Sequence, residues 1–136
     1  MLLNQNTPPV NDVETKNELT FEEAQNCEPF GMYFPSVIAD GYQLEDKVHI
    51  YDETVMEAVF VNSINNDILV LRIAPQSRYD GVETGKVFYK DKGDNKSSYI
   101  YVDCGDYIVY YSSNQYDLNE IDGFKEMVES ASFFRN

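Results

Sequence analysis

The chain has 136 residues, of which 43% are hydrophobic and 25% charged, so it fits one globular domain and excludes a disordered or membrane-embedded composition. Twenty-four acidic residues stand against ten basic ones, and the formal net charge of −14 argues against nucleic acids and anionic lipid surfaces as partners, because both would be repelled. No apolar run approaches the length of about 18 residues that a membrane-spanning helix needs, so we expect no direct membrane insertion of this chain.

The N-terminal segment, residues 1–17, has the composition of a flexible tether. It is rich in Asn, Thr, Pro and charged residues and shows no hydrophobic periodicity. Met1-Leu2-Leu3 is far too short for the apolar part of a signal peptide, so the targeting segment of an exported form would have been removed. We therefore expect a single folded domain that spans residues 18–136.

A short helix is predicted at the start of this domain. Thr20 and Glu23 have the spacing of a capping box, in which each side chain accepts a hydrogen bond from the backbone amide of the other residue. Pro29 is expected to end the helix. Asp40-Gly41 then favours a turn into the first strand.

From residue 42 to about residue 112 the chain alternates short β-forming segments with turn residues, as antiparallel sheets do. The predicted strands are residues 43–51, 55–61, 68–73, 86–90, 99–103 and 106–111. Asn65-Asn66-Asp67 favours a tight hairpin, because Asn tolerates positive φ. The simplest topology is a meander. The segment 74–85 is the longest irregular stretch, and it is the first loop to examine for a function.

The last predicted hairpin turns at Cys104-Gly105. This turn sets the expected cross-strand pairs Asp103–Asp106, Val102–Tyr107, Tyr101–Ile108, Ile100–Val109 and Tyr99–Tyr110. Alternation then places Ile100, Val102, Tyr107 and Val109 on the core face, and Tyr99, Tyr101, Ile108 and Tyr110 on the other face. Two interpretations of the three tyrosines stay open: burial beneath the C-terminal helix, or exposure as a binding surface.

The C-terminal segment is predicted to form a second helix. Asp117 is the expected N-cap residue, with Glu120 in the reciprocal position. Apolar residues recur at helical spacing: Leu118, Ile121, Phe124, Met127, Val128 and Ala131. Since this stripe must lie on the sheet, we predict an α+β fold: an antiparallel sheet of about five to six strands, with a short N-terminal helix and a C-terminal helix packed on it.

Three segments together resemble the bacterial domain family DUF4367: the opening TFEEA helix, the stretch FGMYFPSVIADGYQLEDKVHIY and the closing LNEIDGFKEMVESASFF helix. Pro35-Ser36 and Asp40-Gly41-Tyr42-Gln43-Leu44 carry the most specific part of the resemblance, which covers about residues 18–135. The resemblance implies an extracytoplasmic module of anti-sigma-factor-like proteins or lipoproteins, with a sensory or protein-binding role. It supplies no catalytic residues.

The chemistry-bearing residues give no support for an enzyme. His49 is the single histidine, and it sits within a predicted strand with no local acidic partner at hydrogen-bonding spacing, so the sequence gives poor support for a catalytic triad or a metal site centred on it. The sequence contains neither a G-x-S-x-G motif nor a glycine-rich phosphate loop. We therefore predict a non-catalytic protein without a cofactor or a bound metal.

Cys27 and Cys104 lie far apart in the sequence, and neither belongs to a CxxC pair or a zinc-type spacing. In an oxidising compartment they could form one disulfide between the N-terminal helix region and the tip of the last hairpin. In a reducing compartment they would be ordinary thiols, and the sequence leaves both states open.

These observations favour a sensory or protein-interaction domain of unknown ligand. The expected location is extracytoplasmic, at the cell surface or anchored to a membrane by a segment outside this chain, with the cytoplasm as the alternative. The expected partner is a protein or a cell-envelope component, and the predicted contact residues are Tyr99, Tyr101, Tyr110, Arg78 and Tyr79, since exposed aromatics and arginine dominate binding hot spots. The alternative function, which rests on net charge alone, is an acidic inhibitor that mimics nucleic acid and occupies a basic protein groove.

Overall fold

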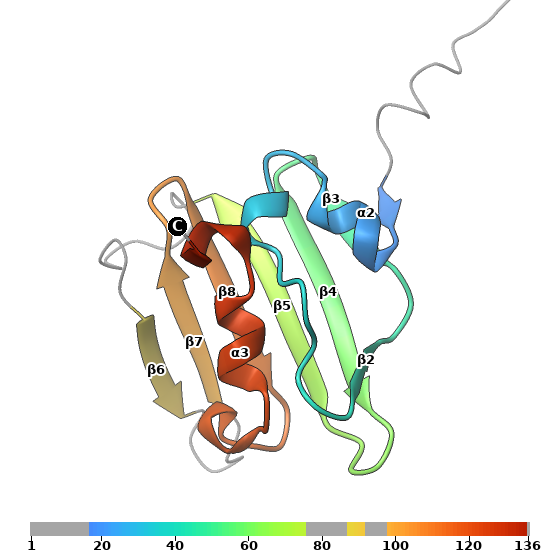
Figure 1. Cartoon of the computed structure of the whole chain (residues 1–136), viewed down its shortest axis with the longest axis vertical. Helices are drawn as coiled ribbons and strands as arrows, with labels where there is room; N and C mark the ends of the chain where they lie inside the picture. Colours follow the sequence, from blue (N-terminus) through green and yellow to red (C-terminus); the bar gives the residue numbers. More distant parts are fainter. Residues whose placement is uncertain (1–16, 76–86, 92–97, 136) are drawn as a thin grey trace, which may run out of the picture.

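The computed structural model describes residues 17–75, 87–91 and 98–135, in which eight short strands form one antiparallel sheet (Figure 1). The strands are β1 (Glu18–Leu19), β2 (Tyr42–Leu44), β3 (Val48–Tyr51), β4 (Val55–Asn62), β5 (Ile68–Pro75), β6 (Val87–Asp91), β7 (Ser98–Asp103) and β8 (Tyr107–Ser113). Short helical segments lie at both ends of the described chain. The predicted α+β class is confirmed, with more strands than the five to six expected.

The order of the strands corrects the predicted meander. Seven strands follow one another as β1-β3-β4-β5-β8-β7-β6, and β2 pairs with β4 beside β3. β5 therefore pairs with β8, while β6 lies at the edge of the sheet, and the last four strands have a Greek-key order. The segment between β5 and β6, residues 76–86, is longer than the two to five residues of a typical hairpin loop, so β6 is not forced to pair with β5.

Residues 43–51, predicted as one strand, are divided between β2 and β3. Both strands pair with β4, Leu44 opposite Phe60 and His49 opposite Glu57. The chain advances five positions from Leu44 to His49 but only three from Phe60 to Glu57, so the interruption at residues 45–47 holds two extra residues, as a β-bulge does. The predicted end of the next strand also moves, since β5 continues through Pro75.

The β4–β5 hairpin is confirmed, and Asn66 in its turn has a positive φ of 64°. The β7–β8 hairpin differs from the prediction by two residues. Tyr101 faces Tyr110, whereas a turn at Cys104-Gly105 would place Ile108 opposite Tyr101. The observed turn residues are Gly105-Asp106, and the Gly105 amide donates to the Asp103 carboxylate over 2.8 Å. Because side chains alternate with a period of two, this shift leaves the predicted faces unchanged.

Helix α2 (Phe21–Gln25) begins at the predicted capping box. The Glu23 amide donates to the Thr20 hydroxyl over 3.1 Å, and the Thr20 amide donates to the Glu23 carboxylate over 2.9 Å. A 3₁₀ turn, η1 (Gly31–Tyr33), follows it before the chain enters β2. The N-terminal helix prediction is thus correct in its start, whereas the observed helix ends at Gln25, before the predicted stop at Pro29.

The C-terminal helix is correct in its apolar stripe but wrong in its continuity. It forms a 3₁₀ turn, η4 (Leu118–Glu120), then α3 (Phe124–Glu129) and a last 3₁₀ turn, η5 (Ser132–Arg135). Asp117 caps η4 through the Asn119 amide, and Gly123 interrupts the helix in a left-handed conformation with φ of 81°. The six predicted apolar residues are nevertheless all buried.

The core lies between the sheet and these helical segments, which all cover the same face of the sheet (Figure 1). Alternation along β4 and β5 explains this arrangement: Ala58 and Phe60 are fully buried, whereas Val59 between them is half-buried on the opposite face. Across the core, Tyr111 of β8 contacts Phe124 of α3 edge-to-face, with ring centroids 5.2 Å apart. The opposite face of the sheet carries no helix from the part of the chain that the structure describes.

Candidate functional site

One row of side chains crosses the face of the sheet that lies away from the helices. The row follows the strand register from β1 to β7 and consists of Glu18, His49, Glu57, Arg72, Tyr110 and Tyr101. Each member stands directly opposite the next on the adjacent strand, and such pairs are the contacts that stabilise a sheet. The end of the row at β1 consists of ionisable side chains, and the end at β7 consists of tyrosines.

The centre of the row is an ion pair between Arg72 and Glu57. The guanidinium donates twice to the same carboxylate oxygen, through Nη2 and, over 3.2 Å, through Nε. The Arg72 side chain keeps 40% of its exposure, and its guanidinium carbon lies 5.9 Å from the centroid of the Tyr110 ring, within cation–π range. Arg72 therefore links the charged part of the row to the aromatic part.

Three tyrosines form a cluster beside Arg72, which we call the tyrosine face: Tyr99, Tyr101 and Tyr110. Their ring centroids are 5.2 Å apart for Tyr101 and Tyr110, 5.4 Å for Tyr99 and Tyr101, and 5.9 Å for Tyr99 and Tyr110. All three rings are half-buried. Because α3 packs on the other side of the sheet, the interpretation that these rings lie beneath the C-terminal helix is wrong.

The tyrosine face unites three of the five predicted contact residues, whereas Arg78 and Tyr79 lie outside the described residues. Arg72 and Glu57 were not among the predicted contact residues, although the sequence carried a signal for them. Each is the only charged residue in its predicted strand, and the Asn-rich turn between the strands sets a register that places them opposite each other.

Cys27 and Cys104 are both free thiols in this structure, and both pack against the core. The proposed disulfide between them stays a prediction. Burial, followed by the charge of neighbouring Glu28, raises the pKa of the Cys27 thiol. Burial and then the Asp103 carboxylate raise the pKa of the Cys104 thiol to about 12. Neither thiol is activated as a nucleophile, because activation requires a lowered pKa.

The raised pKa of Cys104 predicts a loss of stability at alkaline pH. The folded thiol stays protonated between pH 9.0 and about 12, while the unfolded thiol ionises, so the free energy of unfolding falls across this range. From pH 8 to pH 10.5 this one group should remove roughly 2 kcal/mol. Over the same pH interval, we expect the free energy of unfolding of Cys104→Ala to fall by roughly 2 kcal/mol less than that of the parent chain. Urea unfolding with reductant present measures both values. Parallel pH profiles would contradict the burial of the thiol.

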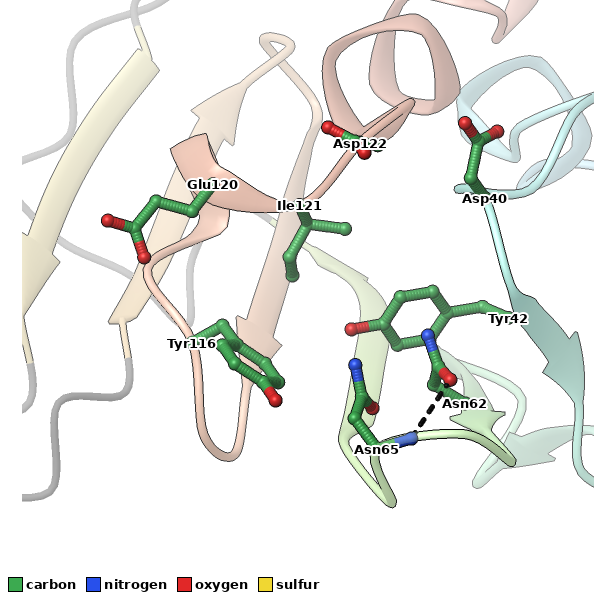
Figure 2. A pocket seen from close by; sticks show the side chains of 8 residues that line it. All are labelled: Asp40, Tyr42, Asn62, Asn65, Tyr116, Glu120, Ile121 and Asp122. Carbon is green, nitrogen blue, oxygen red and sulfur yellow. Dashed lines mark hydrogen bonds between the residues drawn. The ribbon is translucent and has the colours of Figure 1, made fainter.

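A buried polar network stands where the β4–β5 hairpin meets the end of β8. Asp67 is fully buried and accepts hydrogen bonds from the Tyr42 hydroxyl (2.6 Å), the Ser113 hydroxyl (2.8 Å) and the Gln115 amide (2.8 Å). Burial and then the bond to Asp67 raise the pKa of Tyr42 well above its usual value. The network fixes Tyr42 in the wall of a neighbouring pocket (Figure 2).

Within residues 17–75, 87–91 and 98–135, no group of three or more His, Cys, Asp and Glu side chains is placed to hold a metal ion. No helix in these ranges is long and apolar enough to cross a membrane. No protein-family model, no curated protein and no solved structure matches this chain.

Proposed function

We propose that this protein is a non-catalytic interaction domain that binds a protein partner through the tyrosine face. The observation that carries the proposal is the clustering of Tyr99, Tyr101 and Tyr110 beside Arg72 on the face of the sheet that lies away from the described helices. Tyrosine and arginine are enriched in binding hot spots, since each offers a large contact area with a polar end. The half-buried rings can lose their remaining exposure on docking at little conformational cost, because neighbouring rings already restrain them.

Charge indicates the chemistry of the partner. The whole chain has a net charge of −14, whereas Arg72 neutralises Glu57 at the edge of the tyrosine face. A partner with an apolar centre and a basic rim would be attracted by the surrounding negative potential and would then bury the rings. The resemblance to DUF4367 favours an extracytoplasmic setting and a sensory role for this contact, and both belong to the proposal.

The proposal is tested with a photo-crosslinking residue in place of Val70, a half-buried residue on the same face of the sheet and two positions from Arg72 on β5, in extracts of cells that produce the domain. The captured protein is then purified, and its affinity for the domain is measured by calorimetry. We expect Tyr101→Ala to weaken binding at least about tenfold, because truncation of a hot-spot ring costs more than about 1.4 kcal/mol. Thermal unfolding of the variant verifies that it is folded at the assay temperature.

Tyr51→Ala is the matched control. Tyr51 lies on the same face of the sheet, on β3, is 49% exposed and stands outside the tyrosine cluster, so we expect less than about a threefold change. Equal losses from both variants would refute a contact centred on the tyrosine face. An affinity that is unchanged by Tyr101→Ala but falls steeply with added salt would instead support the alternative function, an acidic inhibitor that binds a basic groove.

A further inference from the structure

A pocket of about 220 Å³ lies between the β4–β5 hairpin, the start of β2 and the segment that follows β8 (Figure 2). Its lining combines two asparagines, two tyrosines and three acidic residues. They come from the helix-covered side of the fold and do not include any residue of the tyrosine face. The pocket is therefore a second site, independent of the function proposed above.

The floor of the pocket offers hydrogen-bond donors. Asn62 is only 8% exposed, and its Oδ1 accepts from the amides of Ile64 (2.9 Å) and Asn65 (3.3 Å), which leaves its Nδ2 group to donate elsewhere. Asn65 is arranged in the same way, since its Oδ1 accepts from the Asp67 amide over 2.9 Å. Neither Nδ2 group has a hydrogen-bond partner among the described residues. Figure 2 shows the Asn65 nitrogen directed at the space between Tyr42 and Tyr116, and the Asn62 nitrogen at the ring of Tyr42, on the pocket wall.

The rim of the pocket is acidic. Asp40, Glu120 and Asp122 are all exposed there, and none of the lining residues is Lys, Arg or His. Anionic ligands are therefore disfavoured, and a cation is attracted both by these carboxylates and by the net charge of the chain. The tyrosine rings on the walls add surfaces on which an organic cation can lie.

Contacts within the chain hold the pocket in shape. The Asp40 amide donates to the Asp122 carbonyl over 3.0 Å and so joins two sides of the rim. Gly41 allows the close approach of the Asn62 side chain, since a Cβ atom there would lie 2.9 Å from Nδ2. Tyr42 is anchored to buried Asp67. A site that is already ordered loses little entropy on binding.

We propose that this pocket binds a small ligand that carries a primary ammonium group next to a carbonyl or hydroxyl oxygen. The oxygen accepts from the amides of Asn62 and Asn65 on the floor, and the ammonium group lies toward the carboxylates of the rim. Two sources offer this chemistry: an aminoacyl group and an amino sugar. Both are small enough for the pocket, and the same titration distinguishes them.

The test is a ¹H–¹⁵N titration of the whole chain that follows the side-chain amide signals of Asn62 and Asn65. The probes are alaninamide and glucosamine, and their matched controls, N-acetylalaninamide and N-acetylglucosamine, lack the positive charge. We expect saturable shifts with a dissociation constant on the order of 1 mM, as is typical of ligands this small. A response to alaninamide alone indicates that the ligand is an aminoacyl group, and a response to glucosamine alone indicates that it is an amino sugar. A response to both probes indicates that the pocket recognises the chemistry that they share. No response, or an equal response to the acetylated controls, overturns the proposal.

Two variants separate the rim from the floor. The double variant Glu120→Gln, Asp122→Asn should raise the dissociation constant of the responding probe roughly fivefold. The control is Glu126→Gln, Glu129→Gln, which removes the same formal charge from exposed positions of α3 and should change the dissociation constant less than about twofold. Asn62→Asp keeps the acceptor for the turn amides but removes the donor, so it should also weaken binding. Tighter binding by Asn62→Asp would refute the floor contact, because charge alone would then explain the affinity. Tyr101→Ala should leave the titration unchanged, which separates this site from the tyrosine face.

Discussion

Asp67→Ala should lower the free energy of unfolding by about 3–5 kcal/mol, measured by urea denaturation followed by circular dichroism. The Asp67 carboxylate is fully buried and accepts from Tyr42, Ser113 and the backbone of Gln115. Its removal leaves the hydroxyls of Tyr42 and Ser113 without this acceptor, at roughly 1–3 kcal/mol each, and leaves the Gln115 amide with only the Ser113 Oγ at 3.3 Å. The loss is large because the three donors belong to β2, to β8 and to the segment after β8, which the carboxylate holds against the β4–β5 hairpin.

Two further variants show whether the network, and not the charge, is responsible. Tyr42→Phe deletes one of the donors, so it should cost only about 1 kcal/mol. Asp46→Ala removes an exposed carboxylate and should change stability by less than about 0.5 kcal/mol. If Asp67→Ala cost no more than Asp46→Ala, the network would not hold these segments together.

The local elements of the fold could be predicted from the sequence, because their causes lie within a few residues. Thr20 and Glu23 satisfy each other's backbone amides, and Asn66 takes the positive φ that the β4–β5 turn requires. The apolar stripe from Leu118 to Ala131 is buried as its spacing indicates. The continuity of that last helix could not be predicted in the same way, because Gly123 is left-handed where the chain contacts Asp40 from a distant segment.

The pairing of strands depends on contacts between distant segments, and there the prediction was wrong. Nothing near β5 or β8 in the sequence indicates that the two strands are neighbours, so the meander was only the simplest choice. The β7–β8 register was also wrong by two residues. The two faces were nevertheless assigned correctly, since a shift by two preserves the alternation that separates Tyr110 from Tyr111.

The two candidate sites differ in whether they could be predicted from the sequence, and the reason is the same. The tyrosine face could be predicted because Tyr99, Tyr101 and Tyr110 belong to one hairpin, in which alternation alone groups the side chains. The pocket could not, because its walls come from segments that only the folded chain brings together, such as Asp40 and Asp122. Asn and Asp in turns are common, so the composition of these segments gave no sign of a site.

Phe60→Ala should lower the free energy of unfolding by about 3–5 kcal/mol, again measured by urea denaturation. Phe60 is fully buried at the centre of the sheet, where it pairs with Leu44 on one side and Leu69 on the other. Truncation of the ring removes its transfer free energy and leaves a cavity, which the strands cannot close without losing their register.

Val59→Ala is the control, because Val59 is the adjacent residue on β4 but lies half-buried on the helix-free face. We expect a cost of about 1 kcal/mol there, since the side chain loses less buried area. Equal losses at both positions would mean that the two faces of β4 are equally buried, and the tyrosine face, which lies on the same side of the sheet as Val59, would then be covered too. A large difference would agree with the partial exposure of Val59 and of the three tyrosines on that face.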